Sequence, residues 1–310
     1  MIENKNSRSV ITFATNKEAY FKMALNCARS ILLYNKLNVY IVTNLNLEVP
    51  SDLQEHVFKL QADPEHAKMG IAIKLYTDLY LQTTETLFID SDCLCYADLS
   101  PLFDACQGKE TTVVGFPIGI EEFCGSKAEA QPFIENFGID QLIRFNGGFY
   151  YIKKSATSTS IYNQARSIMP IYDSLGFGRI GGIHINDEWP MSIAITAHLQ
   201  TPITDNGTFI TDLYTSPHPY GLNVLKGKSK LNNPPPTMPK HRRWYINGNY
   251  SPIIVHFGGN SLRSFPYNKQ NLLLLLHKLG FSRFIASAIS WLLIEVPYFI
   301  YYKVRTFFGK

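Results

Sequence analysis

Apolar strands and amphipathic helices alternate through the first third of the chain. Residues 9–13 predict a strand, residues 20–34 repeat apolar positions with a helical period, and residues 38–44 predict the next strand. Apolar residues at every fourth position across 71–79 predict a second helix, which leads into a strand at 86–89. This alternation predicts an α/β fold with a mostly parallel sheet covered by helices on both faces.

Further strands and one further helix are predicted between residues 111 and 257. Strands are predicted at 111–116, 147–154 and 252–257, where apolar and aromatic residues are again concentrated, and a helix is predicted at 191–198. Segment 226–243 mixes lysines, asparagines and three successive prolines, a composition typical of an exposed and mobile loop. Since no internal repeat interrupts this order, one large domain is expected.

The composition supports a folded protein and divides the chain into two parts. Of the 310 residues, 45% are hydrophobic and 17% charged, far from the composition of a disordered chain. The net charge of +4 conceals an asymmetry: residues 226–310 carry 13 Lys and Arg against the single acid Glu295, whereas 1–225 carry 16 basic and 24 acidic residues. We therefore expect a catalytic domain over 1–266 and a basic, apolar, amphipathic helical tail over 267–310 that meets phosphate or anionic lipid.

Cysteine usage and the N-terminus favour a protein of the cytosol. The five cysteines are an odd number, and Cys93-Leu94-Cys95 has no second pair at the spacing of a zinc site, so reduced thiols are expected. Residues 1–16 contain no apolar core preceded by positive charge, so no secretory signal is expected and the cytoplasmic side is the predicted location. Nucleic acid is not an expected partner, because no recognition motif accompanies the basic residues.

Two carboxylates follow directly after the strand predicted at 86–89. Asp90 and Asp92 are two residues apart, so on an extended turn they can point to the same side and share one hard cation. A simple turn after a strand is the commoner explanation of an Asp-Ser-Asp sequence. In parallel sheets, however, ligands bind beyond the carboxyl ends of the strands, which is where both acids fall.

A second group of candidates follows the strand predicted at 252–257. His256 offers an imidazole ligand that suits Mn²⁺ better than Ca²⁺, although a histidine beside a strand is more often structural. Gly258 and Gly259 would let backbone N–H groups approach a diphosphate, and Arg263 can reach the same charge. The segment therefore predicts a phosphate-binding turn beside a metal ligand.

Polar residues also flank two other predicted elements. Asn146, Gly147 and Gly148 open a predicted strand, where small residues leave room for a ligand and the asparagine can bond sugar hydroxyls; an ordinary tight turn accounts for them too. Asp187 and Glu188 stand just before a predicted helix, where acids serve either catalysis or helix N-capping.

In their order along the chain these segments resemble the GT-A nucleotide-sugar glycosyltransferases, and most closely family 8, which includes glycogenin and the bacterial lipopolysaccharide galactosyl- and glucosyltransferases. The resemblance spans residues 9–265 and rests on four segments, LFIDSDCLCYADLSPLF, RFNGGFYYIKKS, INDEWPMSIA and IVHFGGN. It implies a Rossmann-like GT-A fold and glycosyltransferase activity. It also implies that Asp90, Asp92 and His256 hold Mn²⁺ or Mg²⁺ on the diphosphate of a nucleotide sugar.

The resemblance assigns roles to other residues as well. Asn146 belongs to the segment that lines the donor sugar and the acceptor, and Asp187-Glu188 stands where the family has an Asp-Gln pair near the sugar. Lys74 is expected to reach a phosphate or the sugar, although a solvated helix lysine is the other interpretation. The donor-binding residues expected in all are Ala14, Thr15, Asn16, Tyr20, Lys74, Ser91, Gly147, Gly148, Gly258, Gly259 and Arg263.

Two departures from the family pattern leave details open. Gly258-Gly259 is not followed by the Lys-Pro-Trp that family members often have, and Arg263 is the residue expected in place of the lysine. Glu188 replaces a glutamine and adds a negative charge near the sugar, which leaves the donor and the stereochemical outcome open. Membership of a neighbouring GT-A family is an alternative.

These residues together predict a metal-dependent glycosyltransferase that moves a sugar from a nucleoside diphosphate sugar, expected to be UDP-linked, to a hydroxyl acceptor. Negative charge grows on the departing diphosphate, and the cation with Arg263 and glycine N–H groups would stabilise it, while Asp187 or Glu188 positions the sugar or acceptor. Two alternatives stay open: an inactive GT-A scaffold or sugar-binding protein, and a sugar-1-phosphate nucleotidyltransferase. The latter normally needs a glycine-rich basic loop after the first strand, which residues 14–16 do not supply.

The tail contains a mostly apolar run at 284–302 with basic residues on both sides. It is long enough to span a bilayer, but Glu295 and Pro297 lie within it, and a buried acid costs about 2.5–3.5 kcal/mol. Basic flanks with Trp and Tyr favour a helix in the interface of an anionic membrane; helices packed on the catalytic domain are the alternative. The first interpretation predicts a peripheral protein on the cytoplasmic face of a membrane, with a lipid-linked or surface glycan as acceptor.

Overall fold

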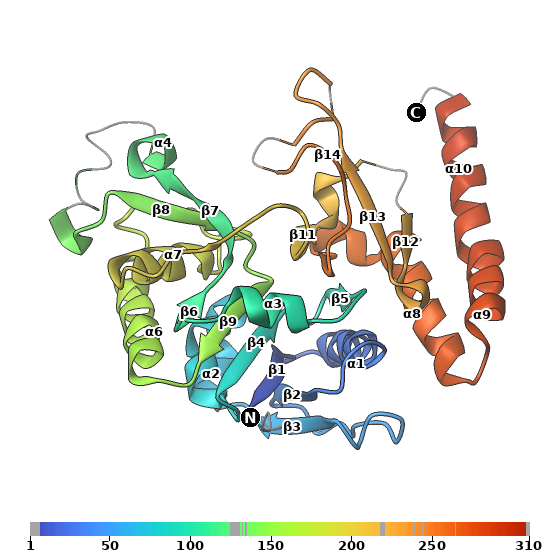
Figure 1. Cartoon of the computed structure of the whole chain (residues 1–310), viewed down its shortest axis with the longest axis horizontal. Helices are drawn as coiled ribbons and strands as arrows, with labels where there is room; N and C mark the ends of the chain where they lie inside the picture. The colour runs from blue at the N-terminus through green and yellow to red at the C-terminus, as the bar shows by residue number, and fades with distance from the viewer. Residues whose placement is uncertain are drawn as a thin grey trace.

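The computed structural model of the chain describes residues 7–124, 131, 133, 135–217, 221–238, 240–242, 245–263 and 265–307. A central six-stranded sheet has helices on both faces, and three small sheets adjoin it (Figure 1). The C-terminal helices stand along one edge of the molecule, far from the edge formed by the helix at Ala156–Ile168 (Figure 1). The predicted α/β architecture is confirmed.

Six strands form the central sheet: β1 (Arg8–Phe13), β2 (Asn38–Thr43), β3 (Val57–Gln61), β4 (Glu85–Ile89), β6 (Thr111–Thr112) and β9 (Phe149–Lys153). Their spatial order is β3-β2-β1-β4-β9-β6. The first four are parallel neighbours, whereas β9 runs antiparallel to β4 and β6. The carboxyl ends of β1, β2 and β4 therefore share one edge of the sheet.

The described helices are α1 (Glu18–Leu32), α2 (Pro64–Lys68), α3 (Ser100–Ala105), α4 (Ile120–Cys124), α6 (Ala156–Ile168), α7 (Glu188–Ala197), α8 (Phe265–Lys278), α9 (Arg283–Ser290), α10 (Val296–Phe307), the 3₁₀ turns η1 (Gly70–Tyr80), η2 (Met169–Ile171), η3 (Leu213–Thr215), η4 (Val224–Lys226) and η5 (Gly259–Arg263), and the π-helical turn η6 (Trp291–Glu295). The helix predicted at 71–79 is the 3₁₀ turn η1. Its burial recurs at Thr77 and Tyr80, three residues apart, while Leu79 is exposed. The four-residue period was therefore the wrong one for this segment.

Successive residues of the central strands face opposite sides of the sheet. Val10 and Leu87 pack with α1 in one hydrophobic cluster, whereas Ile11 and Phe88 pack with η1, α6 and α7 in another. Because both faces bury apolar side chains, the sheet needs helices on both sides.

Nine further strands form the small sheets: β7 (Val114–Gly119), β8 (Gln141–Phe145) and β10 (Ile203–Thr204); β5 (Cys93–Cys95), β11 (Ile210–Asp212) and β15 (Ile254–His256); β12 (Gly221–Asn223), β13 (Lys228–Asn233) and β14 (Gly248–Tyr250). The single strand predicted at 111–116 is split between two sheets. The loop predicted at 226–243 was also wrong in part: it contains β13, which pairs on both sides and buries Leu231 and Asn233. Alternate burial along β13 anchors this segment.

The helix α8 belongs to the folded domain, although the sequence placed it at the start of the tail. Tyr267 and Leu273 are buried in a core cluster, and Gln270 Oε1 accepts a hydrogen bond from the Val224 N–H at 2.8 Å. The alternative of packed helices therefore holds for α8.

Four cysteines are buried as free thiols: Cys27, Cys93, Cys95 and Cys106. Burial raises the pKa of Cys95 and of Cys106 to about 12, so both thiols stay neutral and unreactive near neutral pH. The prediction of reduced thiols holds for these four, and the Cys124 side chain lies outside the described part of the chain.

Candidate active site

The turn after β4 meets the ends of two strands from another sheet. Asp90 and Asp92 belong to this turn, and β15 ends at His256. The pairing of β15 with β5 places Cys93 opposite His256, and its pairing with β11 places Asp212 opposite His256. Strand register therefore brings together acids that are far apart in the sequence.

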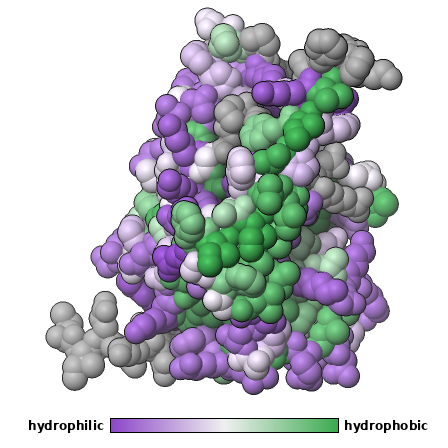
Figure 2. Space-filling view, turned by 90° about the vertical axis from the view of Figure 1, so that its right-hand side faces the viewer, coloured by the Kyte–Doolittle hydropathy of each residue, from purple (hydrophilic) through white to green (hydrophobic). Residues whose placement is uncertain are grey.

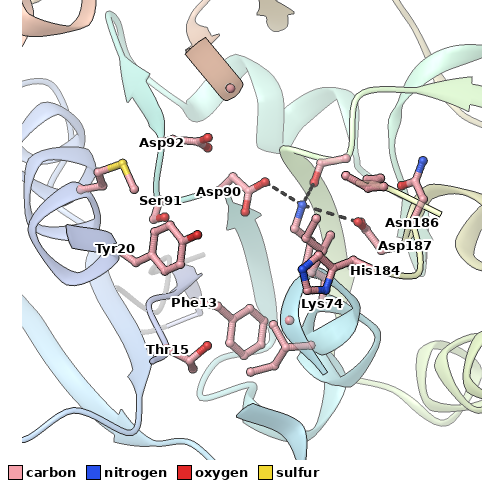
Figure 3. Close-up of a pocket in the computed structure, with 18 of the residues that line it drawn as sticks. Phe13, Thr15, Tyr20, Lys74, Asp90, Ser91, Asp92, His184, Asn186 and Asp187 are labelled. Atoms are coloured by element: carbon pink, nitrogen blue, oxygen red, sulfur yellow. Dashed lines mark hydrogen bonds and ion pairs between the residues drawn. The ribbon is translucent and has the colours of Figure 1, made fainter. Parts of the chain in front are cut away.

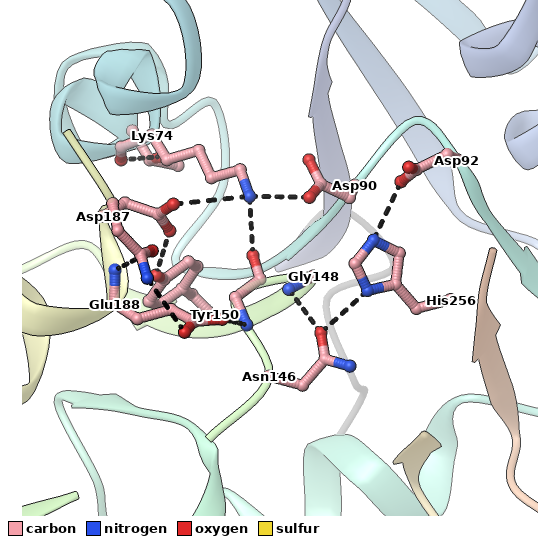
Figure 4. Close-up of polar contacts among 12 residues, drawn as sticks. Lys74, Asp90, Asp92, Asn146, Gly148, Tyr150, Asp187, Glu188 and His256 are labelled. Carbon is pink, nitrogen blue, oxygen red and sulfur yellow. Dashed lines mark hydrogen bonds and ion pairs between the residues drawn. The ribbon is translucent and has the colours of Figure 1, made fainter. Parts of the chain in front are cut away.

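His256 contacts Asp92, Asn146 and Asp212, and we call these four residues the histidine cluster. Figure 4 shows the contacts of His256 with Asp92 and Asn146. His256 Nε2 lies 3.2 Å from Asp92 Oδ1, and Nδ1 lies 2.7 Å from Asp212 Oδ1 and 3.1 Å from Asn146 Oδ1. The Gly148 N–H donates to Asn146 Oδ1 at 2.7 Å, which identifies that atom as the amide oxygen. Because Nδ1 faces two acceptors it carries a proton, and Nε2 is the atom directed at Asp92.

The donor atoms of the histidine cluster fit a divalent cation such as Mn²⁺ or Mg²⁺. Ligand atoms of Asp92, Cys93 and His256 lie within 4.8 Å of one another. Burial and then Asp92 raise the pKa of Cys93, so its thiol stays neutral and the carboxylate and imidazole remain as ligands. Asp212 bonds the second ring nitrogen, as carboxylates do where they orient a metal-binding histidine. Asp90, the third predicted ligand, is bonded to a lysine here.

That lysine organises a second group, the lysine cluster of Lys74, Asp90, Asp187 and Glu188, on the other side of the turn (Figure 4). Lys74 Nζ lies 2.6 Å from Asp90 Oδ2 and 3.6 Å from Asp187 Oδ1, and it donates to the Gly147 carbonyl at 3.0 Å. Burial would lower the pKa of Lys74, but Asp187 and Asp90 outweigh it and raise the pKa. With its side chain 11% exposed, Lys74 is not the solvated helix lysine of the alternative interpretation.

The two acids at the start of α7 face the site. Asp187 occupies the N-cap position without a capping hydrogen bond from its side chain, and it accepts a hydrogen bond from the Tyr150 hydroxyl instead. Glu188 Oε1 accepts from the Gly147 N–H at 2.9 Å, and Oε2 accepts from Asn186 Nδ2 at 3.3 Å. Burial and then Asp187 raise the pKa of Glu188. These contacts favour a role in the site over helix capping.

A cavity of about 630 Å³ joins the two clusters (Figure 3). The predicted residues that line it are Thr15, Asn16, Tyr20, Lys74, Asp90, Ser91, Asp92, Gly147, Asp187, Glu188, His256, Gly258 and Gly259. Ala14, Asn146 and Gly148 are not lining residues, and the Arg263 side chain lies outside the described residues. Among the lining residues four carry carboxylates and two are lysines, so a bound diphosphate requires an accompanying cation.

The loop after β1 forms the wall opposite the lysine cluster (Figure 3). Thr15 and the exposed Tyr20 line the cavity there, and Lys17 Nζ lies over the tyrosine ring, 5.4 Å from its centroid. Asn16 adopts φ 69°, and its side chain is already used: Nδ2 donates to the Ala67 carbonyl at 2.7 Å, and Oδ1 accepts from Asn44 at 2.9 Å. Asn16 therefore shapes the loop, because an asparagine tolerates this left-handed conformation.

Glycines at 147 and 148 allow the two clusters to approach each other. A Cβ at Gly148 would lie 2.8 Å from Asn146 Oδ1 and 3.2 Å from His256 Nδ1, and one at Gly147 would lie 3.0 Å from Glu188. Any side chain there would displace one of the clusters, so these glycines do more than make a tight turn.

One buried donor of the site has no hydrogen-bond partner among the residues that the structure describes. Nδ2 of Asn146 is buried, while Oδ1 of the same amide is used by Gly148 and His256. An unpaired buried donor costs about 1–3 kcal/mol, which a ligand oxygen would relieve. Because Asn146 does not line the cavity, the contact with sugar or acceptor predicted for it stays a prediction.

Three neighbouring residues were not predicted. Asp212 orients His256, and the Tyr245 hydroxyl donates to Asp212 Oδ2 at 3.2 Å. His184 lines the cavity against Gly70, where an added Cβ would lie 2.8 Å from its Nδ1. Asp212 does follow an apolar strand, as Asp90 does, but no sequence signal reveals the pairing of β11 with β15 that makes it relevant.

No protein-family model matches the sequence, and no curated protein matches it significantly. Solved structures do match. The galactosyltransferase LgtC, crystallised with donor and acceptor sugar analogues, is 14% identical over 81% of this chain and 87% of its own, with a TM-score of 0.47. Mouse xyloside xylosyltransferase 1 is 11% identical over 82% of this chain and 98% of its own, with a TM-score of 0.47.

The glycosyltransferase GlyE of Streptococcus pneumoniae TIGR4 also matches, at 15% identity over 67% of this chain, with a TM-score of 0.40. The chain spans only 48% of the length of GlyE. All three matched proteins are glycosyltransferases by name, as the resemblance in the sequence leads us to expect.

Proposed function

We propose that this protein is a metal-dependent glycosyltransferase that moves a sugar from a UDP-sugar to a hydroxyl group of a glycan or glycolipid. The observation that carries the proposal is one cavity with two unlike walls: a carboxylate and an imidazole suited to a cation, and a buried lysine among carboxylates. A diphosphate matches the first wall and a polyhydroxylated sugar the second.

In this proposal the histidine cluster binds the diphosphate of the donor through a cation. A cation held by Asp92 and His256, with Asp90 adjoining, supplies the positive charge that a diphosphate leaving group requires. Gly258 and Gly259 line the same cavity, and their lack of side chains leaves the backbone open to phosphate oxygens.

In this proposal the lysine cluster binds the sugar of the donor. Carboxylates accept hydrogen bonds from hydroxyl groups, which suits Asp187 and Glu188 for holding the donor sugar, while Lys74 donates. Such fixed contacts on several hydroxyls orient the anomeric carbon toward the acceptor.

The proposal is tested by incubating the full chain with Mn²⁺ and a panel of nucleotide sugars, with and without hydroxyl acceptors, and measuring nucleoside diphosphate release. We expect release from one donor, which Asp92→Asn abolishes. Asp104→Asn is the matched control, because Asp104 is an exposed acid outside the cavity. Pyrophosphate formation from a sugar phosphate and a nucleoside triphosphate would instead identify a nucleotidyltransferase, and donor binding without turnover an inactive scaffold.

A further inference from the structure

The outward side of the C-terminal helices carries a large apolar surface. α9, η6 and α10 form one continuous helical segment, and its stretch Arg283–Arg305 is long and apolar enough by length and composition to cross a membrane. Only 11% of its most apolar window is buried. Figure 2 shows a band of hydrophobic residues on this side of the molecule. We call its exposed apolar residues the tail face: Phe284, Ile285, Trp291, Leu292, Leu293 and Ile300.

The inward side of the same segment packs against the rest of the domain near its start and near its end. Near the start, Ala286 is buried and Asn223 Nδ2 donates to Ser287 Oγ at 3.1 Å. Near the end, the rings of Phe265 and Tyr298 stack with centroids 4.5 Å apart. A helix inserted across a bilayer would lose all of these contacts, whereas a helix lying on a bilayer keeps them.

The π-helical turn η6 accounts for the position of Glu295, the acid within the apolar run. The Val296 N–H bonds to the Trp291 carbonyl, an i→i+5 pattern that takes one residue more per turn than an α-helix. This extra residue rotates Glu295 toward the side already buried at Ser290. There Glu295 pairs with Lys269 of α8, and both side chains are less than a fifth exposed.

The exposed charged residues of the segment that carries the tail face are basic. Glu295 is the only acid in residues 226–310, and it is turned inward onto Lys269. Exposed Arg283 stands at one end of the segment, and exposed Lys303 stands at the other. An apolar surface with a cationic rim complements the anionic face of a lipid bilayer. A second copy of this chain would bring a rim of the same charge against it.

We propose that the tail face is a membrane-docking surface, on which α9 and α10 lie in the plane of an anionic bilayer with the tail face among the acyl chains. The inference goes beyond the transfer reaction and does not depend on it, because vesicle binding needs neither donor nor metal. A helix in this position is anchored by apolar burial and by the attraction of its basic ends to the lipid headgroups.

The first test is co-sedimentation of the full chain with vesicles of phosphatidylcholine alone or with phosphatidylglycerol added. We expect binding to the anionic vesicles that weakens at high salt, and a loss of at least tenfold in Leu292→Glu. Leu199→Glu is the matched control, since Leu199 is an exposed leucine outside the tail, and it should bind as the wild type does. Equal circular dichroism spectra establish that both variants fold.

The second test uses vesicles that contain brominated lipid, which quenches tryptophan fluorescence on contact. Trp291 is half exposed on the tail face, whereas Trp189 stacks on Phe177 within the domain. Quenching is expected in the wild type, and it should fall in Trp291→Phe and persist in a variant that replaces the third tryptophan of the chain, Trp244→Phe.

Four results would overturn the proposal. They are no binding to anionic vesicles, equal binding by Leu292→Glu and Leu199→Glu, retention in the bilayer after alkaline carbonate extraction, which identifies a spanning helix, and a dimer in vesicle-free solution that Leu292→Glu dissociates.

Discussion

The lysine cluster and the histidine cluster surround the same turn after β4, but they balance their charges in different ways. In the lysine cluster an internal cation, Lys74, lies between Asp90 and Asp187. In the histidine cluster two carboxylates share one imidazole, whose proton is on the nitrogen that faces Asp212. Only the second cluster leaves a nitrogen and a carboxylate oxygen side by side for an external cation.

This difference indicates a division of labour within one cavity. A cluster built around its own cation holds its acceptors in place before the ligand arrives, which suits the recognition of neutral hydroxyl groups. The histidine cluster sets a ring nitrogen beside a carboxylate oxygen, which suits a ligand that brings its own cation, such as a metal-bound diphosphate. Variants that remove the central group of each cluster should therefore fail in different ways.

The largest effect is expected from His256→Ala. The variant should lower kcat/KM for the donor at least about 100-fold and abolish binding of Mn²⁺, because the imidazole ligand is lost and Asp92 has no partner. Binding is measured by electron paramagnetic resonance of free Mn²⁺ and turnover by nucleoside diphosphate release. His56→Ala, at a partly exposed position outside the cavity, is the control, and normal Mn²⁺ affinity in His256→Ala would contradict the assignment.

Lys74→Met should act on stability as much as on activity. Removing the buried ammonium leaves Asp90 and Asp187 without compensation, which is expected to cost roughly 3–5 kcal/mol of unfolding free energy. Urea unfolding measures this loss. Lys22→Met, which breaks an exposed ion pair to Glu18, should cost no more than about 1 kcal/mol. Equal losses in the two variants would show that Lys74 does not stabilise the buried carboxylates of Asp90 and Asp187.

Asp212→Asn tests whether the Asp212 carboxylate orients the His256 ring for metal binding. The affinity for Mn²⁺ should fall about 10–100-fold while the fold stays intact, since the amide holds the ring less firmly than the carboxylate does. Saturating Mn²⁺ should restore most of the turnover, which separates positioning from a direct catalytic role. Asp173→Asn, at an exposed acid, should leave the Mn²⁺ titration unchanged. A turnover defect that Mn²⁺ does not relieve would exclude this role.

The smallest effect is expected from Glu188→Gln, and it depends on pH. The fold raises the pKa of Glu188 above its ordinary value of 4.5, so the protonated carboxyl stabilises the native state at low pH and this contribution is lost as pH rises through the folded pKa. The variant should therefore gain stability relative to the wild type as pH rises from 4 toward neutral, as followed by urea unfolding. A difference that stays constant with pH would contradict the shift.

Much of the fold and part of the site could be predicted from local pattern. The strands at 9–13, 38–44 and 86–89 form where apolar runs predict them, and the acids after the last of these do face a cavity. Periodicity failed at 71–79, where the chain turns every three residues. Composition failed in part at 226–243, where pairing on both sides makes a strand of Lys228–Asn233. Both errors arise because neighbouring elements, and not intrinsic preference, decided the local structure.

The sequence by itself determined which chemistry is present: two acids at a strand end, a histidine at another, and one acid within an apolar basic tail. Tertiary structure decided what each of them does. The register of β11 with β15 sets Asp212 behind His256, and burial of Lys74 turns it from a surface lysine into the centre of a cluster. The π-helical turn directs Glu295 to Lys269 and leaves the tail face apolar. These outcomes depend on contacts between residues far apart in the chain, and local hydrophobic periodicity contains no information about them.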